Sequence, residues 1–354
     1  MSSGSDGPRS SKRTRVDEED GPPVLQRDED VWLSDGNIVV IASDTVAFRV
    51  HKSILSLRSE VFSDLFSLPD ANMAETMDGL PVVHVSDSPD DIRRLLLVLC
   101  CGKNYYYNRD VLVPVPFAVL ASLIRMAHKY AIQDVLDDAL SRLKRYYTND
   151  LSLWRDPDAR ARYVTATAHD APAAVELARL TNTPLLLPTA LLVCVGLAET
   201  YSVADDGSGG AAESHVATLS VPERARLVHV KGYLTQACAT RALYLVAAVP
   251  SAGCASRRAC TASKEALLEE FREPGNVYSL RVRHISDGNA LTPIAEKLWQ
   301  DDDWERFCGV CREALAKMDA KGVKALWSTL PALFEVDIDK DVWRNGEAPA
   351  GGAS

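Results

Sequence analysis

Four cysteines in the C-terminal half of the chain occur as two spaced pairs. Cys254 and Cys260 are separated by five residues, and Cys308 and Cys311 by two. Thiolates arranged as two such pairs can hold a structural zinc ion in tetrahedral geometry. The spacing of the first pair is wider than usual, however, and a reduced cysteine is also a common buried residue. The pattern therefore predicts either a structural zinc site or four buried thiols.

The surroundings of Cys308 and Cys311 do not favour a redox role. Thiol–disulfide exchange at a Cys-x-x-Cys pair normally uses a strand that leads into a helix, and no such order occurs here. The other four cysteines lie in apolar helical stretches and need no special role: Cys100, Cys101, Cys194 and Cys238. Cysteines in apolar runs favour a reducing intracellular compartment, which would be cytoplasmic or nuclear.

The sequence carries none of the common catalytic motifs. It has no Gly-x-Ser-x-Gly elbow, Walker loop, dinucleotide fingerprint or His-Glu-x-x-His. The glycine cluster at residues 207–210 follows no strand and is interpreted as a linker. We therefore expect no catalytic residues, no bound organic cofactor and no enzymatic activity.

The composition is that of a globular protein with an acidic surface. Hydrophobic residues make up 47% of the chain, and the formal net charge is −10. Direct sequence-specific binding of nucleic acid is not expected, because duplex binding needs clustered lysine and arginine. The most apolar stretches, Val111–Ile124 and Leu185–Ala198, are shorter than the ~20 residues of a membrane span. We expect no membrane association.

Residues 1–29 form a polar leader that is expected to be disordered, because it combines low hydrophobicity with high charge. Within it, Lys12-Arg13-Thr14-Arg15 is a small basic cluster. Such a cluster is compatible with a nuclear-import signal and equally with a solvated tail.

Residues 30–147 have the pattern of an α+β domain, a small sheet covered by helices. The apolar run Asn37–Ala42 and the alternating segment Val46–Val50 flank a turn, which predicts a hairpin. A third strand is expected at Val82–Val85. Helices are expected between and after these strands, one of them capped by Ser59.

The rest of the chain is expected to be an all-α C-terminal region at residues 148–340. A flexible loop at 204–215 should interrupt it, and residues 341–354 should form a disordered tail. Helical patterns occur at Val175–Arg179, Leu185–Leu197, Val221–Val249, Lys264–Phe271 and Thr292–Lys317. The chain shows no internal repeat of solenoid or propeller type.

Several separated segments resemble the BTB/POZ domain family. They are Asp35–Val39, then Phe48–Leu55 with its aromatic-x-x-His-Lys step, then Arg58–Phe66 with the pattern Ser-x-x-Phe-x-x-x-Phe. Further on, Met126–Tyr130 resembles the late Ala-x-Lys-Tyr helix of that domain. The resemblance covers about residues 30–147 and implies a BTB/POZ fold.

The chain is similar in particular to BTB-containing proteins abundant in mushroom-forming (basidiomycete) fungi. Those proteins share a Trp-x-x-Asp-Gly-Asn entry, as at Trp32–Asn37, and a helical tail that ends like Leu326–Phe334. Similar paired cysteines in the tail of these relatives favour the zinc interpretation.

The resemblance implies roles for a few residues. Asp35 and Lys52 match positions that line a charged pocket near the interface of BTB dimers. His51 is expected to be packed and hydrogen-bonded at the start of a helix. Met73 and Glu75 stand where many BTB proteins carry a hydrophobic-x-Glu motif that recruits a cullin-type ubiquitin-ligase scaffold, although Met73 is also compatible with local packing.

The sequence thus predicts a protein-interaction scaffold whose BTB domain binds itself or a partner protein, while the helical tail presents a second surface. BTB domains pair through N-terminal helices or by exchanging a first strand. Few residues before Asp35 can form a helix, so we expect a homodimer without assigning its mode. The alternatives are a substrate adaptor for a cullin-type ubiquitin ligase and a nuclear transcription or chromatin regulator.

Overall fold

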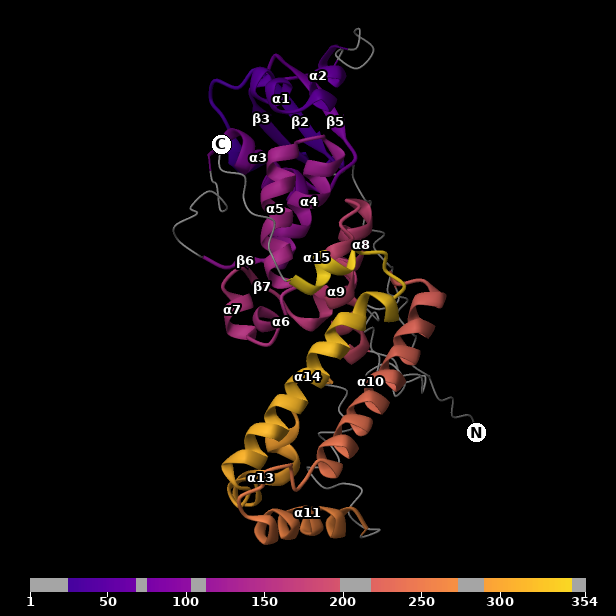
Figure 1. Ribbon diagram of the computed structural model, residues 1–354. Coiled ribbons are helices and arrows are strands. Elements are labelled where there is room, and N and C mark those ends of the chain that lie inside the picture. Colours follow the sequence, from indigo (N-terminus) through magenta and orange to yellow (C-terminus); the bar gives the residue numbers. More distant parts are fainter. Residues whose placement is uncertain (1–24, 68–74, 103–112, 198–217, 273–289, 346–354) are drawn as a thin grey trace, which may run out of the picture. The chain divides into compact units, whose positions relative to one another are not determined.

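The computed structural model of the 354-residue chain describes residues 25–67, 75–102, 113–197, 218–272 and 290–345, with only the backbone at 300–303 and 344–345 (Figure 1). The chain divides after Gly102 into two compact units. Among the described helices, none is long and apolar enough to cross a membrane.

The first unit is built around a five-stranded sheet in the order β1-β3-β2-β5-β4. β2 (Ile38–Ala42) and β3 (Val46–Val50) form the antiparallel hairpin that the sequence predicts. β5 (Leu80–Val85) runs parallel to β2, and the short β4 (Thr76–Met77) is antiparallel to β5. All five residues of β2 are buried, so the centre of the sheet is covered on both faces.

Three helices complete the first unit: α1 (Lys52–Arg58), α2 (Glu60–Ser67) and α3 (Pro89–Cys100). Ser59 caps α2 as expected, because its Oγ accepts a hydrogen bond from the N–H of Phe62 at 3.1 Å. α1 packs against α2 and α3, and α3 packs against β1 and β3. The sheet and helices of this unit confirm the α+β prediction.

β1 (Gln26–Trp32) is an edge strand, parallel to β3, that the sequence analysis missed. Residues 26–29 had been assigned to the disordered leader. Only Asp28 and Val31 of the strand are buried. The Asp28 carboxylate accepts the N–H of Val31 at 2.8 Å and the Nε–H of Arg93 in α3 at 2.5 Å. One buried carboxylate and one buried valine, rather than an apolar stripe, anchor this strand, so hydrophobic periodicity could not reveal it.

The second unit begins with an antiparallel helical layer. α4 (Phe117–Lys129) packs against α5 (Gln133–Tyr146) and α8 (Ala171–Leu180), which in turn packs against α9 (Leu187–Leu197). Short elements connect them: β6 (Val115–Pro116), α6 (Leu151–Trp154), α7 (Pro157–Ala161), β7 (Val164–Thr165) and the 3-10 turns Ala168–Asp170 and Pro184–Leu186. Because α4 contacts α8, the compact units do not follow the domain boundary expected at residue 147.

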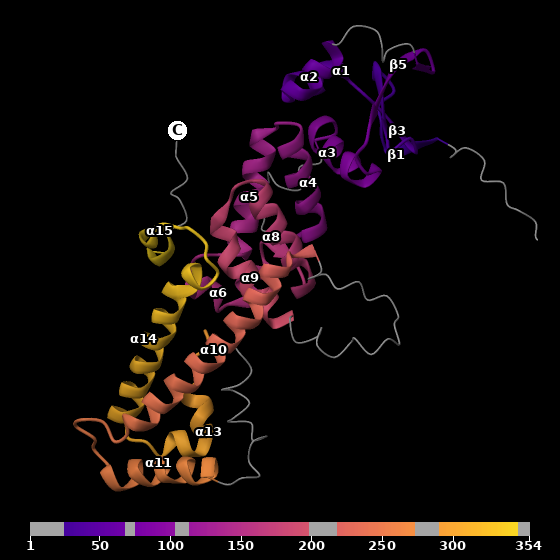
Figure 2. The ribbon, with the colours of Figure 1, turned by 90° about the vertical axis from the view of Figure 1, so that its right-hand side faces the viewer.

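The remainder of the second unit is formed by long helices. α10 (Val221–Ala247) and α14 (Gly309–Leu333) contact each other and α9. α11 (Arg257–Arg272) and α13 (Ala295–Glu305) lie at the end of α14 opposite α15 (Lys340–Asn345) in both views (Figures 1 and 2). We call the region formed by α11, α13 and the start of α14 the distal end of the tail.

Two expectations for the tail were wrong. The single helix predicted at Thr292–Lys317 is broken into α13 and α14, because Cys308 has extended backbone and caps α14. The tail predicted to be disordered from residue 341 begins instead with α15. Trp343, 1% exposed, stacks on Trp327 with ring centroids 5.0 Å apart. The predicted flexible loop at 204–215 lies outside the described residues.

A buried ion pair connects α10, α13 and α14. The Nε of Arg241 lies 3.0 Å from Oδ1 of Asp319, and both side chains are almost fully buried. The other oxygen of Asp319 accepts the N–H groups of Ile294 and Ala295, at 2.6 and 2.8 Å, where α13 begins. Arg241 also donates to the carbonyl of Ala290 at 2.6 Å. These bonds satisfy donors at a helix start that otherwise lacks a side-chain cap.

Candidate metal centre and interaction residues

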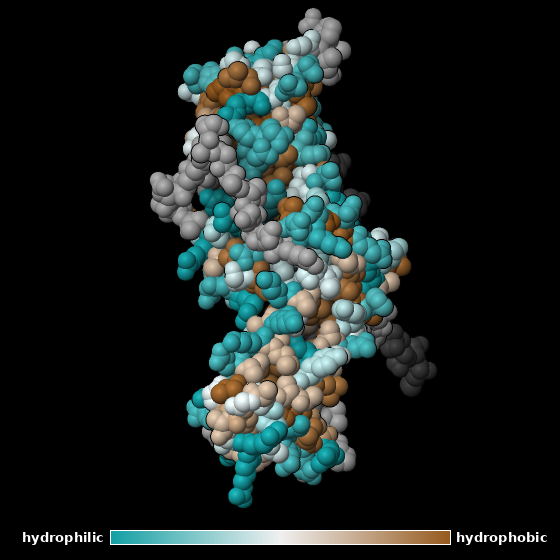
Figure 3. Space-filling model, in the orientation of Figure 1, coloured by the Kyte–Doolittle hydropathy of each residue, from teal (hydrophilic) through white to brown (hydrophobic). Residues whose placement is uncertain are grey.

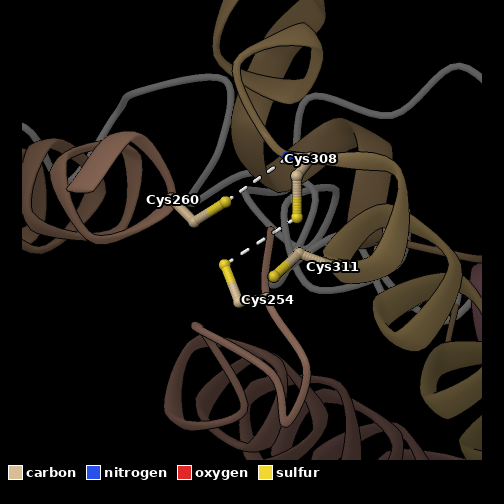
Figure 4. Close-up of side chains that lie close together, drawn as sticks. All are labelled: Cys254, Cys260, Cys308 and Cys311. Carbon is tan, nitrogen blue, oxygen red and sulfur yellow. Dashed lines mark hydrogen bonds between the residues drawn. The ribbon is translucent and has the colours of Figure 1, made fainter. Parts of the chain in front are cut away.

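The four cysteines of the two sequence pairs meet at the distal end of the tail. Cys254 lies in the segment between α10 and α11, Cys260 in the first turns of α11, and Cys308 and Cys311 at the start of α14. All four sulfur atoms lie within 4.8 Å of one another. Figure 4 shows the four side chains pointing toward a common centre.

Local backbone geometry explains how these sulfurs converge. Cys308 is the residue before α14 and Cys311 falls in its first turn, so a two-residue spacing places both thiols at one helix start. Gly253 has φ of +80°, a conformation that favours glycine, and turns the chain just before Cys254. The wider spacing of the first pair thus reflects one cysteine in a turn and one in a helix.

Hydrogen-bond donors face two of the sulfurs. The N–H of Cys308 points to Sγ of Cys260 at 3.4 Å. Sγ of Cys311 is 3.4 Å from the N–H of Ser251 and 3.2 Å from its hydroxyl. Such donors stabilise thiolate ligands and fix their orientation.

The thiols of the cluster have different proton affinities. The backbone N–H of Cys311 is the main cause that lowers the pKa of Cys308 to about 6. Burial raises the pKa of Cys260 to about 12 and also raises the pKa of Cys254. A negatively charged sulfur is therefore favoured at the N-terminus of α14, as expected at the positive end of a helix dipole.

Aromatic side chains precede the second cysteine pair. The rings of Trp299 and Phe307, both buried, contact edge to face with centroids 5.2 Å apart, and Trp304 lies 6.1 Å from Phe307. These residues belong to α13 and the turn after it. Cys308 therefore follows them as the residue before α14 and does not lie inside a helix.

The remaining described cysteines stand apart from this cluster. Cys194 in α9 and Cys238 in α10 are buried, as their apolar surroundings predict. Burial raises the pKa of Cys194 to about 12, which keeps it a neutral thiol.

Of the interaction residues, Asp35 and Lys52 lie on the first unit. The Asp35 side chain is 81% exposed, and its Oδ1 lies 3.3 Å from Nε2 of His51. Lys52 donates to the carbonyl of Phe66 at 3.3 Å. His51 starts α1 with a largely covered ring, in line with the expected packing role. Because Asp35 is exposed in the single chain, a buried charged pocket here requires a second chain.

Glu75 makes a bridge that the sequence did not suggest. Its Oε2 lies 2.9 Å from Nε2 of His84, and Nδ1 of the same ring lies 2.6 Å from Oδ1 of Asp44. The bond to Asp44, followed by that to Glu75, raises the pKa of His84 despite partial burial. Met73, the other residue of the expected motif, lies outside the described residues.

Two exposed apolar side chains on neighbouring helices were also missed. Leu57 at the end of α1 is 86% exposed, whereas Leu55 of the same helix is fully buried. Val61 in the first turn of α2 is 39% exposed. Leu57 follows no helical apolar pattern. Val61 belongs by helical period to the apolar face of α2 with Phe62, Leu65 and Phe66, and its partial exposure departs from that expectation.

The tail carries a groove between α10 and α14. It has a volume of about 700 Å³, and its walls include Tyr233, Tyr244, Met318 and Leu326. Tan and brown residues mix with teal ones over these helices on the face shown in Figure 3. Exposed tyrosine and methionine are common at protein interfaces, so this groove is compatible with the second surface that the sequence predicts for the tail.

Comparison with known protein families identifies the domain that the sequence resembles. Residues 33–146 match the BTB/POZ domain family. The matched range runs from the entry of β2 to the last residue of α5 and carries the motifs from which the resemblance was inferred. The chain therefore combines an α+β BTB/POZ domain with a helical C-terminal region. No curated protein and no solved structure matches the chain significantly.

Proposed function

Because the chain carries a BTB/POZ domain, a type of protein-interaction module, we propose that it is a scaffold that forms homodimers through this domain. The observation that carries the proposal is the exposed apolar pair Leu57 and Val61 in the first unit. Burying an exposed leucine side chain contributes about 1.5–3 kcal/mol. In a two-fold interface the same side chains are buried on both chains, so this contribution counts twice.

Two further features support self-association. The exposed Asp35, held by His51, offers a carboxylate at a position that lines the dimer pocket in related domains. β1 is also available as a first strand of the kind that some BTB domains exchange, because it ends the strand order of its sheet. An edge strand leaves backbone groups that a second chain can pair. We propose contact through α1 and α2, with strand exchange as the competing dimer mode.

The experiment is a mass measurement of the full chain by light scattering after gel filtration. We expect twice the chain mass of 38.6 kDa for the wild type. The double variant Leu57→Asp with Val61→Asp should elute as a monomer, because the interface would then bury carboxylates without partners. Leu180→Asp, at a residue 45% exposed at the end of α8, is the matched control and should stay dimeric.

A wild type that remains monomeric at every concentration would refute the proposal. A double variant that remains dimeric would reject contact through α1 and α2 and favour exchange of β1. Circular dichroism of each variant separates loss of pairing from loss of folding.

No described residue favours the two alternative functions. The adaptor hypothesis needs Met73 and Glu75, and the carboxylate of Glu75 is engaged by His84. The nuclear-regulator hypothesis rests on Lys12–Arg15, which lies outside the described residues, as does Met73. Cullin co-purification with wild type and with Met73→Ala plus Glu75→Ala would test the first. A reporter fusion of the full chain would test the second.

A further inference from the structure

We propose that Cys254, Cys260, Cys308 and Cys311 bind a single zinc ion that holds the distal end of the tail together. This inference concerns the tail alone and does not depend on the dimer proposal. It is carried by the convergence of four thiols from three chain segments, which the sequence could suggest only as a possibility.

The distances fit one tetrahedral ion. Zinc–sulfur bonds of about 2.3 Å place the corners of a tetrahedron about 3.8 Å apart. The sulfurs of Cys254 and Cys308 are 3.8 Å apart, and all four lie within 4.8 Å of one another. A disulfide would require a separation of about 2.05 Å. The sulfurs are therefore spaced for a shared ion rather than for a bond between them.

The ligand set selects the metal class. Four sulfur donors suit a soft or borderline ion and disfavour magnesium and calcium, which prefer oxygen. The cysteines of an iron–sulfur cluster bind different iron atoms and lie farther apart than ligands of one ion. Zinc, without redox chemistry, is the usual ion in a closed four-cysteine site. Because protein ligands fill all four positions, the site is structural rather than catalytic.

The surroundings are suited to the charge of such a site. Four thiolates around a divalent ion carry a net charge of −2. α11 and α14 both begin at the cluster, so the positive ends of two long helices face it. The N–H groups of Cys308 and Ser251 point at sulfurs. Helix ends and amide donors are the features that stabilise bound thiolates.

Within the distal end, α11 has little else to hold it. α11 buries only Cys260, Ser263 and Leu267 among its 16 residues. One buried leucine supplies about 1.5–3 kcal/mol, whereas ordering the backbone costs about 1–2 kcal/mol per residue. A metal that links α11 to α14 therefore supplies stability that apolar contact does not.

The test is metal analysis of the full chain, produced with zinc and iron both present in the medium. We expect about one zinc per chain, released when a mercurial reagent blocks the thiols. Cobalt added to the stripped protein should give the visible absorption bands of tetrahedral thiolate coordination. Cys254→Ser and Cys308→Ser should each lower zinc content at least tenfold, whereas Cys100→Ser, at a half-buried cysteine of the first unit, should not.

Several outcomes would overturn the proposal. They are a metal-free chain in which the four cluster thiols react freely, stoichiometric iron in place of zinc, or a disulfide found within the cluster. If a serine variant fails to fold, cobalt titration of the stripped wild type still decides the matter. Absence of the tetrahedral spectrum there would refute the site.

Discussion

The first unit and the distal end of the tail are held together by different means. The sheet buries a continuous apolar cluster of Val39, Ile41, Ala47 and Val82, with all of β2 inaccessible. The distal end has few such contacts around α11, and its four cysteines converge instead. Hydrophobic stabilisation grows with the apolar area that is buried. A surface helix such as α11, which buries little, therefore needs another source of stability. The difference supports the stabilising role that we propose for the cysteines.

The sharpest test of this comparison is metal removal followed by amide hydrogen exchange. Structural zinc contributes about 10–16 kcal/mol in small zinc-dependent domains. We expect a chelator to abolish protection in α11 and to lower it at the start of α14. The amides of β2 and β3 should keep their protection. Equal loss in both regions, or in neither, would show that the two are not held differently.

The next largest effect is expected at the buried ion pair. Asp319→Ala leaves Arg241 buried without its partner and should lower the free energy of unfolding by about 3–5 kcal/mol. Urea denaturation followed by tryptophan fluorescence measures this change. Glu313→Ala, which removes an exposed pair with Lys317 on the same helix, is the control and should cost less than about 1 kcal/mol. Equal changes in the free energy of unfolding would show that the buried pair stabilises the tail no more than an exposed pair does.

Within the first unit, α1 allows a buried leucine to be compared with an exposed one. Leu55→Ala should destabilise the unit by about 2–5 kcal/mol, because it leaves a cavity in the core. Leu57→Ala should change stability by less than about 0.5 kcal/mol in the monomer. Thermal unfolding at low protein concentration measures both. Similar losses of stability in the two variants would contradict the finding that Leu55 is buried and Leu57 exposed.

Two glycines of the tail test how tightly α10 and α14 pack. A Cβ at Gly322 would lie 2.8 Å from Cδ of Arg241, whereas a Cβ at Gly232 meets nothing within 4 Å. Gly322→Ala should destabilise by about 1–3 kcal/mol through overpacking. Gly232→Ala should stabilise α10 by about 0.5–1 kcal/mol, since alanine is the better helix former. Denaturation midpoints of the two variants are expected to move in opposite directions.

The smallest expected effect concerns pH and His84. Asp44 and then Glu75 raise its pKa above the ordinary value of 6.5. Protonation therefore favours the folded state, fully so below about pH 6.5, and this contribution is lost as the pH rises through the raised pKa. Solvent screens the half-exposed ring, so the effect on stability is slight. An NMR titration should show a lower pKa for His84 in Asp44→Asn; an unchanged pKa would contradict the bridge.

The elements that the sequence predicts correctly are those with a strong hydrophobic periodicity. The β2–β3 hairpin and the helix capped by Ser59 follow from alternating or helical apolar residues, and both are present. β1 and α15 were missed because few of their residues are buried, Asp28 and Val31 in β1 and Trp343 in α15, within otherwise polar segments. Hydrophobic periodicity reveals an apolar face of an element and cannot reveal one or two buried residues.

The candidate metal site was only partly visible in the sequence. Spacing singled out the four cysteines whose sulfurs converge, yet Cys260 and Cys308 are 48 residues apart. Their proximity depends on how α10, α13 and α14 pack together. No local sequence pattern can predict this packing. The exposed Leu57 and the bridge at His84 likewise depend on tertiary neighbours.

The separation of the two cysteine pairs along the chain has a consequence for biosynthesis. A ribosome delivers Cys254 and Cys260 well before Cys308 and Cys311. If the four cysteines bind zinc as proposed, the growing polypeptide first offers two thiols of an incomplete site, and α11 can be fixed only after the first turn of α14 has emerged. The proposed site would therefore be assembled late, by a closure that joins residues translated at different times.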